Sequence, residues 1–207
     1  MNAEPSRSPA EPGATESGPE TQWPRNWDAV VAAIGEEFGE DKIAWGADRV
    51  ELSGVRRFLE PFEFDCPLHY DKAVALQHGY PDVVAPSASL RMFASPALWE
   101  PGSQPIFTDA ARDAQPDQAS PARHLPRFAP PTTALIMTEV EWDFLMPVVI
   151  GDHLGIHLRR RISACAPKAL KIGQGAFVTI EHRICNQRHE LVANIRLTYF
   201  TYNPSDS

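Results

Sequence analysis

Residues 63–71, which read Glu-Phe-Asp-Cys-Pro-Leu-His-Tyr-Asp, bring several groups capable of acid–base chemistry into one short segment. Carboxylates, a thiol and an imidazole stand here within nine positions: Glu63, Asp65, Cys66, His69 and Asp71. Histidine exchanges protons near neutral pH, and a carboxylate can donate or accept a proton when it lies beside the reacting atoms. This segment is therefore the candidate site, and the elements on either side of it must position it.

Short helical patterns flank the candidate site. Ser53 is a suitable N-cap for a helix over Val55 to Glu60, which Pro61 should end because proline has no backbone N–H. Asp71 is a suitable N-cap for a second helix over Lys72 to His78. The candidate site is thus expected to form the loop between two helices.

Two further helices are predicted outside this pair. Apolar residues spaced as on one helix face follow Asp28, and Gly39 should close that helix. The run Ala88 to Leu98 follows Ser87 and is interrupted only by Arg91 and Pro96. A helix that is apolar on most sides is expected to be buried.

The C-terminal third changes character. Four segments alternate apolar with polar residues and are rich in β-branched and aromatic side chains, which is typical of strands: residues 136–144, 154–162, 176–185 and 191–202. Their spacing suits hairpins and predicts an antiparallel sheet. An early buried helix and a late sheet predict an α+β domain whose sheet wraps a central apolar helix.

The overall composition limits the class of protein. The 207 residues suffice for one domain, predicted over 27–204, and the net charge of −8 argues against nucleic acid as a partner. Residues 1–26 are rich in proline and polar residues and are predicted to be disordered, and residues about 100–131 form a proline-rich insert.

The choice of compartment rests on what the sequence lacks. No apolar run is long enough to span a bilayer, and the first residues do not resemble a secretion signal. Three unevenly spaced cysteines suggest neither a metal site nor a disulfide framework. We expect a cytoplasmic protein with reduced thiols and no membrane partner.

An ordered series of short motifs resembles the MaoC-like acyl dehydratases, and more narrowly the FAS1-type dehydratase domain. The matching fragments follow one another from residue 57 to residue 154: Arg57–Glu60, Cys66–Asp71, Gly79–Tyr80, Val83–Pro86, Glu141–Phe144, Pro147 and Gly151–Leu154. Each fragment alone is weak, but the order is specific. The resemblance implies a hot-dog fold, a dimeric active site and reversible, usually R-specific, addition of water to enoyl thioesters.

The resemblance also implies roles for residues of the candidate site. His69 falls at the position of the family's catalytic histidine, two residues after Pro67. The family's loop reads Gly-Asp-x-Asn-Pro-x-His, so its acid position is occupied here by Phe64, which cannot transfer a proton. Asp65, one residue later, is the first candidate to replace that acid, and Glu63 and Glu60 are the others. The alternative role for Asp65 is a structural one in the loop.

Two more assignments follow from the same comparison. The family places its thioester-carbonyl donor at the start of the helix after residue 86, so the backbone N–H of Ser87 is the expected oxyanion donor. The alternative is a plain N-cap serine, and both can hold together. Cys66 stands at the family's asparagine position; hydration needs no covalent step, so we interpret it as a small space-filling residue.

The expected function is a hydratase or dehydratase acting on a coenzyme A or carrier-protein thioester, with no other cofactor and no metal. The chain either catalyses this reaction itself or is the hot-dog partner of a catalytic subunit, and self-association or a paired subunit is expected in both cases. A thioesterase would need a carboxylate on or beside the central helix, and Ala88 to Leu98 has none. A binding module without turnover is the other alternative, and Phe64 favours it.

Overall fold

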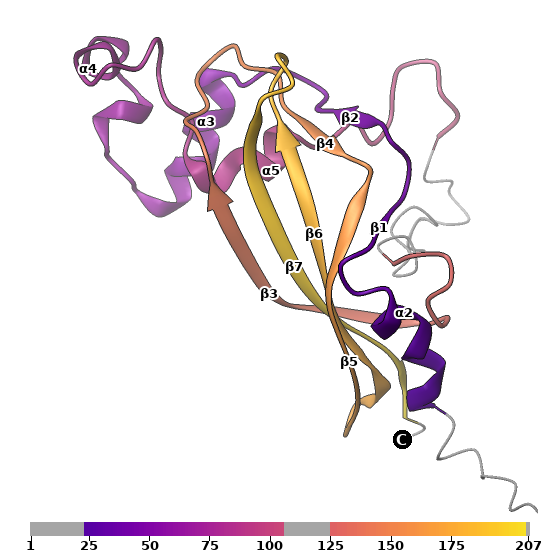
Figure 1. The fold of residues 1–207 in the computed structure, drawn as a ribbon. Helices are drawn as coiled ribbons and strands as arrows, with labels where there is room; N and C mark the ends of the chain where they lie inside the picture. The colour runs from indigo at the N-terminus through magenta and orange to yellow at the C-terminus, as the bar shows by residue number, and fades with distance from the viewer. Residues whose placement is uncertain (1–22, 106–124, 206–207) are drawn as a thin grey trace, which may run out of the picture.

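The computed structural model describes residues 23–105 and 125–205. Within these ranges, seven strands form one antiparallel sheet: β1 (Glu37–Phe38), β2 (Ile43–Trp45), β3 (Ala134–Phe144), β4 (Gly155–His157), β5 (Arg160–Leu170), β6 (Gly173–Cys185) and β7 (Leu191–Pro204). Figure 1 shows a curled sheet whose long strands have most of the helices beside their upper ends. The sheet therefore has a concave inner face.

β6 and β7 form the centre of the sheet. β6 pairs with β7 on one side and with β4 and β5 on the other, and β7 also pairs with β3. β1 and β2 extend the far side by pairing with β5 and β4. The two edges consequently differ: one consists of two very short strands, and the other is the 11-residue strand β3.

The strand predictions hold with two corrections. The segment 154–162, predicted as one strand, is divided between β4 and β5. Residues 155–161 lie opposite the shorter segment 181–185 of β6, so the additional residues interrupt the pairing. β5 continues to Leu170 and contains Pro167, which an unpaired strand edge tolerates. The second correction is that β3 lies beside β7, not beside the strand that follows it in sequence.

The helices before the sheet are short: η1 (Pro24–Trp27), α2 (Asp28–Ala32), α3 (Leu52–Leu59), η2 (Glu60–Phe62), η3 (Pro67–His69), α4 (Lys72–Gln77), η4 (Ser87–Ser89) and α5 (Leu90–Phe93). α3 begins one residue before the predicted Ser53 cap, with Glu51 as N-cap. α2 ends at Ala32 rather than at Gly39, because the chain turns at Gly35 and Phe38 pairs with β5.

The predicted central helix is much shorter than the apolar run suggests. In place of one helix over Ala88 to Leu98, η4 and α5 end at Phe93. Pro96 explains the stop, since proline cannot donate a helical hydrogen bond and disfavours helix in the residue before it. Only part of the run is buried: Leu90 and Ala94 are inside, whereas 62% of the Leu98 surface is exposed.

Two clusters of apolar side chains make the core. The first lies beside α3 and α5 and includes Val55, Leu90 and Ile195; the second lies beside α2 and includes Val30 and Ile162. β6 runs through both clusters, which joins the two ends of the molecule. No helix among the described residues is long and apolar enough to cross a bilayer.

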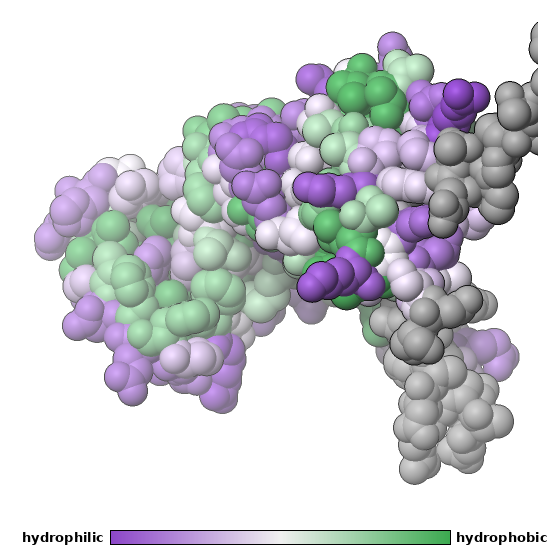
Figure 2. Space-filling view, turned by 90° about the horizontal axis from the view of Figure 1, so that it is seen from below, coloured by the Kyte–Doolittle hydropathy of each residue, from purple (hydrophilic) through white to green (hydrophobic). Residues whose placement is uncertain are grey.

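Figure 2 views the molecule from below and shows green, apolar side chains scattered among polar ones over the helical part at the left. Exposed apolar residues of these helices and loops include Phe62, Phe64, Leu76 and Met92, each with 46–68% of its surface accessible. A single chain thus leaves apolar side chains of its helical end exposed to solvent.

Candidate active site

The candidate site is a loop held by its own backbone and by the start of α4. The Tyr70 hydroxyl donates a hydrogen bond of 2.7 Å to the carbonyl oxygen of Phe64. Asp71 caps α4 as predicted, since its Oδ1 accepts from the N–H of Ala73 at 2.7 Å and of Val74 at 3.3 Å. Residues 64–71 therefore have a fixed backbone between η2 and α4.

His69 is anchored through one ring nitrogen. Its Nδ1 lies 2.7 Å from the carbonyl oxygen of Val84, and the ring is half-buried. A carbonyl oxygen can only accept, so Nδ1 carries a proton, and in the neutral imidazole Nε2 is then the nitrogen with the free lone pair. The anchored imidazole therefore presents a basic nitrogen, which is the state a general base requires.

The segment that anchors His69 leads directly to Ser87. Val84 N–H donates to the Leu68 carbonyl at 3.0 Å, and Ala85 N–H donates to the Val148 carbonyl at 2.8 Å. Three extended residues span about 10 Å at most, so Ser87 lies close to the point where His69 is bound. Ser87 is exposed, and its N–H has no acceptor within the described parts of the chain.

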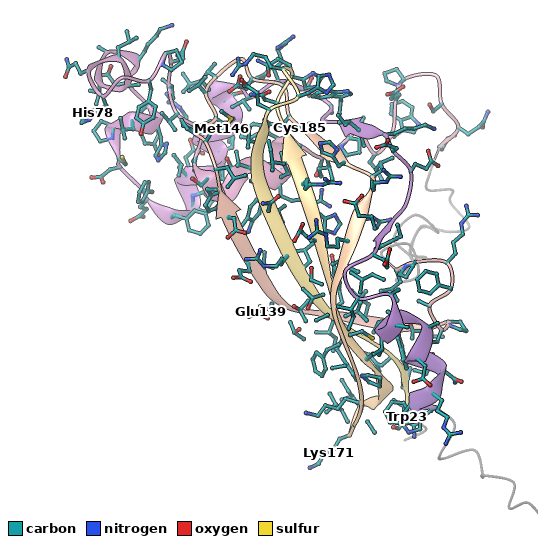
Figure 3. All side chains as sticks on the ribbon, in the orientation of Figure 1. Trp23, His78, Glu139, Met146, Lys171 and Cys185 are labelled. Carbon is teal, nitrogen blue, oxygen red and sulfur yellow. The ribbon has the colours of Figure 1, made fainter. Side chains whose placement is uncertain are left out.

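A hollow of about 320 Å³ adjoins this segment. Its wall comes from the loop after α4, the start of η4 and α5, and the end of β3 with the turn that follows: Tyr80, Val84, Ala85, Ser87, Leu90, Phe144, Leu145, Met146, Pro147 and Val148. Figure 3 shows Met146 at this end of β3, beside the helices. Most of these side chains are apolar, but polar atoms make up about half of the surface that the wall exposes.

The carboxylates of the loop are not bound to His69. The Phe64 ring lies against the imidazole, with 5.7 Å between the ring centroids, whereas no hydrogen bond or ion pair joins Asp65 to His69. Asp65 and Glu63 are exposed, and Glu63 has a left-handed backbone (φ 49°). Glu60 accepts a 3.0 Å bond from Arg57. The aromatic ring, not a carboxylate, is thus the neighbour of the imidazole.

Cys66, Cys165 and Cys185 are free thiols. Cys66 precedes η3, and its carbonyl accepts from the His69 N–H at 3.1 Å. Burial raises the pKa of the Cys165 thiol to about 11 and also raises that of Cys185. No group of three or more His, Cys, Asp or Glu side chains within residues 23–105 and 125–205 could hold a metal ion.

Two parts of the site could not be found by inspecting the loop alone. The Val84 carbonyl, which anchors His69, is a backbone group and has no sequence signal of its own beyond the motif in which it stands. The wall formed by Phe144 to Met146 comes from about 75 residues further along the chain. The sequence signal for this wall was Pro147, which follows Met146 and which the motif series included without assigning it a place in the site.

A family model decides the identity of this domain. The model described as "FAS1-like, dehydratase domain region" matches residues 32–195, which is most of the chain. The chain belongs to this family. The match thus includes the loop with His69, the segment with Ser87, all of β6 and the first residues of β7.

A curated relative supports the same family at low identity. The "Probable enoyl-CoA hydratase alpha subunit" of Thermomonospora curvata is 25% identical over 181 residues, which are 84% of this chain and 51% of the relative. The FAS1-like dehydratase domain therefore spans about half the length of the curated relative that it matches.

Solved structures show the fold. The ChsH1–ChsH2 complex of Mycobacterium tuberculosis contains a chain that superimposes with a TM-score of 0.60 at 18% identity, covering 90% of this chain and 99% of that one. A MaoC-like dehydratase gives a TM-score of 0.53 at 19% identity over 84% of this chain and 43% of its own. The FAS1-like dehydratase domain has the hot-dog fold, as the motif series predicted.

Proposed function

We propose that this domain is a subunit of an (R)-specific enoyl-thioester hydratase, which adds water to enoyl thioesters and removes it from 3-hydroxyacyl thioesters. Coenzyme A or a carrier protein would hold the acyl group. The observation that carries the proposal is the 2.7 Å bond from His69 Nδ1 to the carbonyl of Val84, because Val84 also belongs to the wall of the hollow that contains Ser87. The family membership gives the reaction class.

In the proposed hydration, Nε2 of His69 removes a proton from water while the water oxygen bonds to Cβ of the enoyl group. The electron pair of the double bond moves toward the thioester carbonyl and creates a negative oxygen. Ser87 N–H stabilises that oxygen, since preorganised backbone donors act on the charge that develops in the transition state. A proton delivered to Cα then completes the product.

The mechanism also needs an acid that delivers this proton to Cα. Asp65 is our candidate because it is exposed and makes no competing hydrogen bond or ion pair in the described chain. Glu60 is less suitable because its carboxylate is paired with Arg57. Asp65 is not part of the wall of the hollow in this structure.

One observation favours a second function. Phe64 stands where the family's motif has its acid, and its ring lies against His69, with 5.7 Å between the ring centroids. In that alternative, the domain binds the acyl chain and shapes the tunnel, and a partner subunit supplies the complete acid–base pair. Both functions include a second hot-dog subunit.

Loss of enoyl-thioester absorbance separates the two functions. The full chain would be assayed alone with an enoyl-CoA substrate, together with His69→Ala, Asp65→Asn and the control His78→Ala. His78 is exposed at the end of α4 and lines no part of the site (Figure 3). We expect His69→Ala to lower kcat by about 10²-fold or more, and His78→Ala to leave it unchanged.

Asp65→Asn should lower kcat to a comparable extent if Asp65 delivers the proton. The proposal of catalysis by this chain fails if the parent has no activity alone and if activity restored by a hot-dog partner is indifferent to His69→Ala. That result would instead support the non-catalytic partner.

A further inference from the structure

The edge strand β3 is long, exposed and paired on one side only. It pairs with β7, and no other strand among the described residues lies along its free edge. Half of its backbone N–H and C=O groups therefore face away from the sheet. Its inward side chains are also incompletely covered, because about 45% of the surface of Val140 and of Phe144 is exposed to solvent.

Charges alternate across the outer face of the sheet as far as this edge. Directly opposite residues on neighbouring strands share a face, so the register aligns Glu37 on β1, Arg161 on β5, Glu181 on β6, Arg196 on β7 and Glu141 on β3. The signs along this row are negative, positive, negative, positive and negative. The row thus ends at the free edge on Glu141, whose carboxylate pairs with Arg196 on its inner side.

Two more carboxylates lie on the same face of β3 next to Glu141. Glu139 and Asp143 flank it at alternate positions, and among the described residues Arg196 is the one cation that binds this group, at 2.8 Å from both Glu141 and Asp143. The Arg196 guanidinium lowers the pKa of the Glu141 carboxyl, which keeps it ionised at neutral pH. Three negative charges therefore face one positive charge along the edge.

This charge arrangement opposes the central registers in which β3 could pair with a second copy of itself. In a two-fold antiparallel pair centred anywhere from residue 139 to residue 143, at least one carboxylate lies directly opposite another. Centring on Val140, for example, places Glu139 opposite Glu141 of the other copy. Like charges directly opposite each other destabilise a strand pair.

We propose that β3 pairs with the edge strand of a different hot-dog subunit that carries lysine or arginine opposite Glu139 and Glu141. Such a strand continues the alternating row by one more position. The inference rests on the proposed function for its hot-dog partner, and it states which kind of partner binds: a basic-edged, non-identical subunit.

The same edge is continuous with the candidate site. Phe144 is the last residue of β3 and also lines the hollow beside Ser87. A strand bound along β3 therefore lies next to the hollow and can contribute side chains to its wall. Figure 3 places Glu139 on the outer margin of β3, along the strand from Met146.

A charge-reversed copy of this chain can stand in for the basic partner. Glu139→Lys/Glu141→Lys would be mixed with the parent at equal concentration in about 10 mM salt, where charges act over about 30 Å. Sedimentation measures the complexes formed, without substrate. We expect the mixed pair to bind about tenfold or more tightly than either chain binds itself, and to dissociate in about 1 M salt.

Glu36→Lys/Glu100→Lys is the matched control, because both residues are exposed, are not in β3 and change the net charge equally. Its mixture with the parent should bind no more tightly than the parent alone. A second variant, Glu139→Gln/Glu141→Gln, should self-associate several-fold more than the parent, and it keeps the test valid if the reversed chain fails to fold.

The inference is overturned if the reversed chain binds the parent no better than the control does, or if the parent forms a homodimer that neither salt nor these substitutions change. Both results concern association alone, so they are distinguishable from a failure of the proposed catalysis.

Discussion

His69 and Phe64 define the site at the scale of single residues. The imidazole is oriented by a backbone carbonyl and is flanked by an aromatic ring. In our proposal it is the basic half of an acid–base pair. The Tyr70 hydroxyl binds the backbone carbonyl of residue 64, not its side chain. Residue 64 can therefore be exchanged without removing the bond that holds the loop.

Phe64→Asp is expected to raise the rate of hydration by the full chain by about 10²-fold, because it places a proton-transferring group beside His69. The enoyl-thioester assay measures the change. Phe64→Asn is the control, since it removes the same ring but cannot transfer a proton. Equal activity of the two variants would contradict the view that the missing acid limits this chain.

At the scale of elements, α4 depends on a side chain at its first turn. It has six residues, too few for a stable isolated helix, and its free N–H groups at Ala73 and Val74 are bound by Asp71. The same turn follows η3, which contains His69. Stability of α4 is thus coupled to the order of the candidate site.

Asp71→Ala should lower the free energy of unfolding by about 1 kcal/mol, because two N–H groups at the start of α4 lose their acceptor. Urea unfolding followed by circular dichroism measures the change. Asp71→Ser retains an acceptor and should cost much less. If the serine and alanine variants were equally stable, the cap would contribute nothing.

At the scale of the whole molecule, the sheet joins the two apolar clusters into one core. Ile184 on β6 belongs to the cluster beside α5, and Ile162 on β5 belongs to the cluster beside α2; both are buried completely. β5 and β6 are paired over most of their length. The two ends of the domain are therefore expected to unfold together.

Ile184→Ala and Ile162→Ala should each lower the free energy of unfolding by about 2–5 kcal/mol, because each leaves a cavity in a closely packed core. Tryptophan fluorescence and far-ultraviolet circular dichroism should give the same midpoint for each variant. Ile172→Ala, at a residue with 46% exposure in the turn after β5, is the control with little effect. Separate midpoints for the two probes would show that the ends unfold independently.

Local signals in the sequence were sufficient for the elements that depend on neighbouring residues. Asp71 caps α4, Pro61 follows α3 and the alternating segments form strands, because caps, proline breaks and period-two patterns act within a few residues. The same ordered motifs predicted the family and the hot-dog fold. They also identified His69, Asp65 and Ser87 as the site, whose catalytic roles stay predictions.

Only the tertiary structure decided which distant parts meet. The Val84 carbonyl anchors His69, β3 pairs with β7, and the charged row ends on Glu141 at a free edge. The apolar run after Ser87 forms a helix only as far as Phe93. Strand partners and side-chain anchors are selected by packing between residues far apart in sequence, which local patterns do not encode, and so the partner-facing edge became visible only in the folded chain.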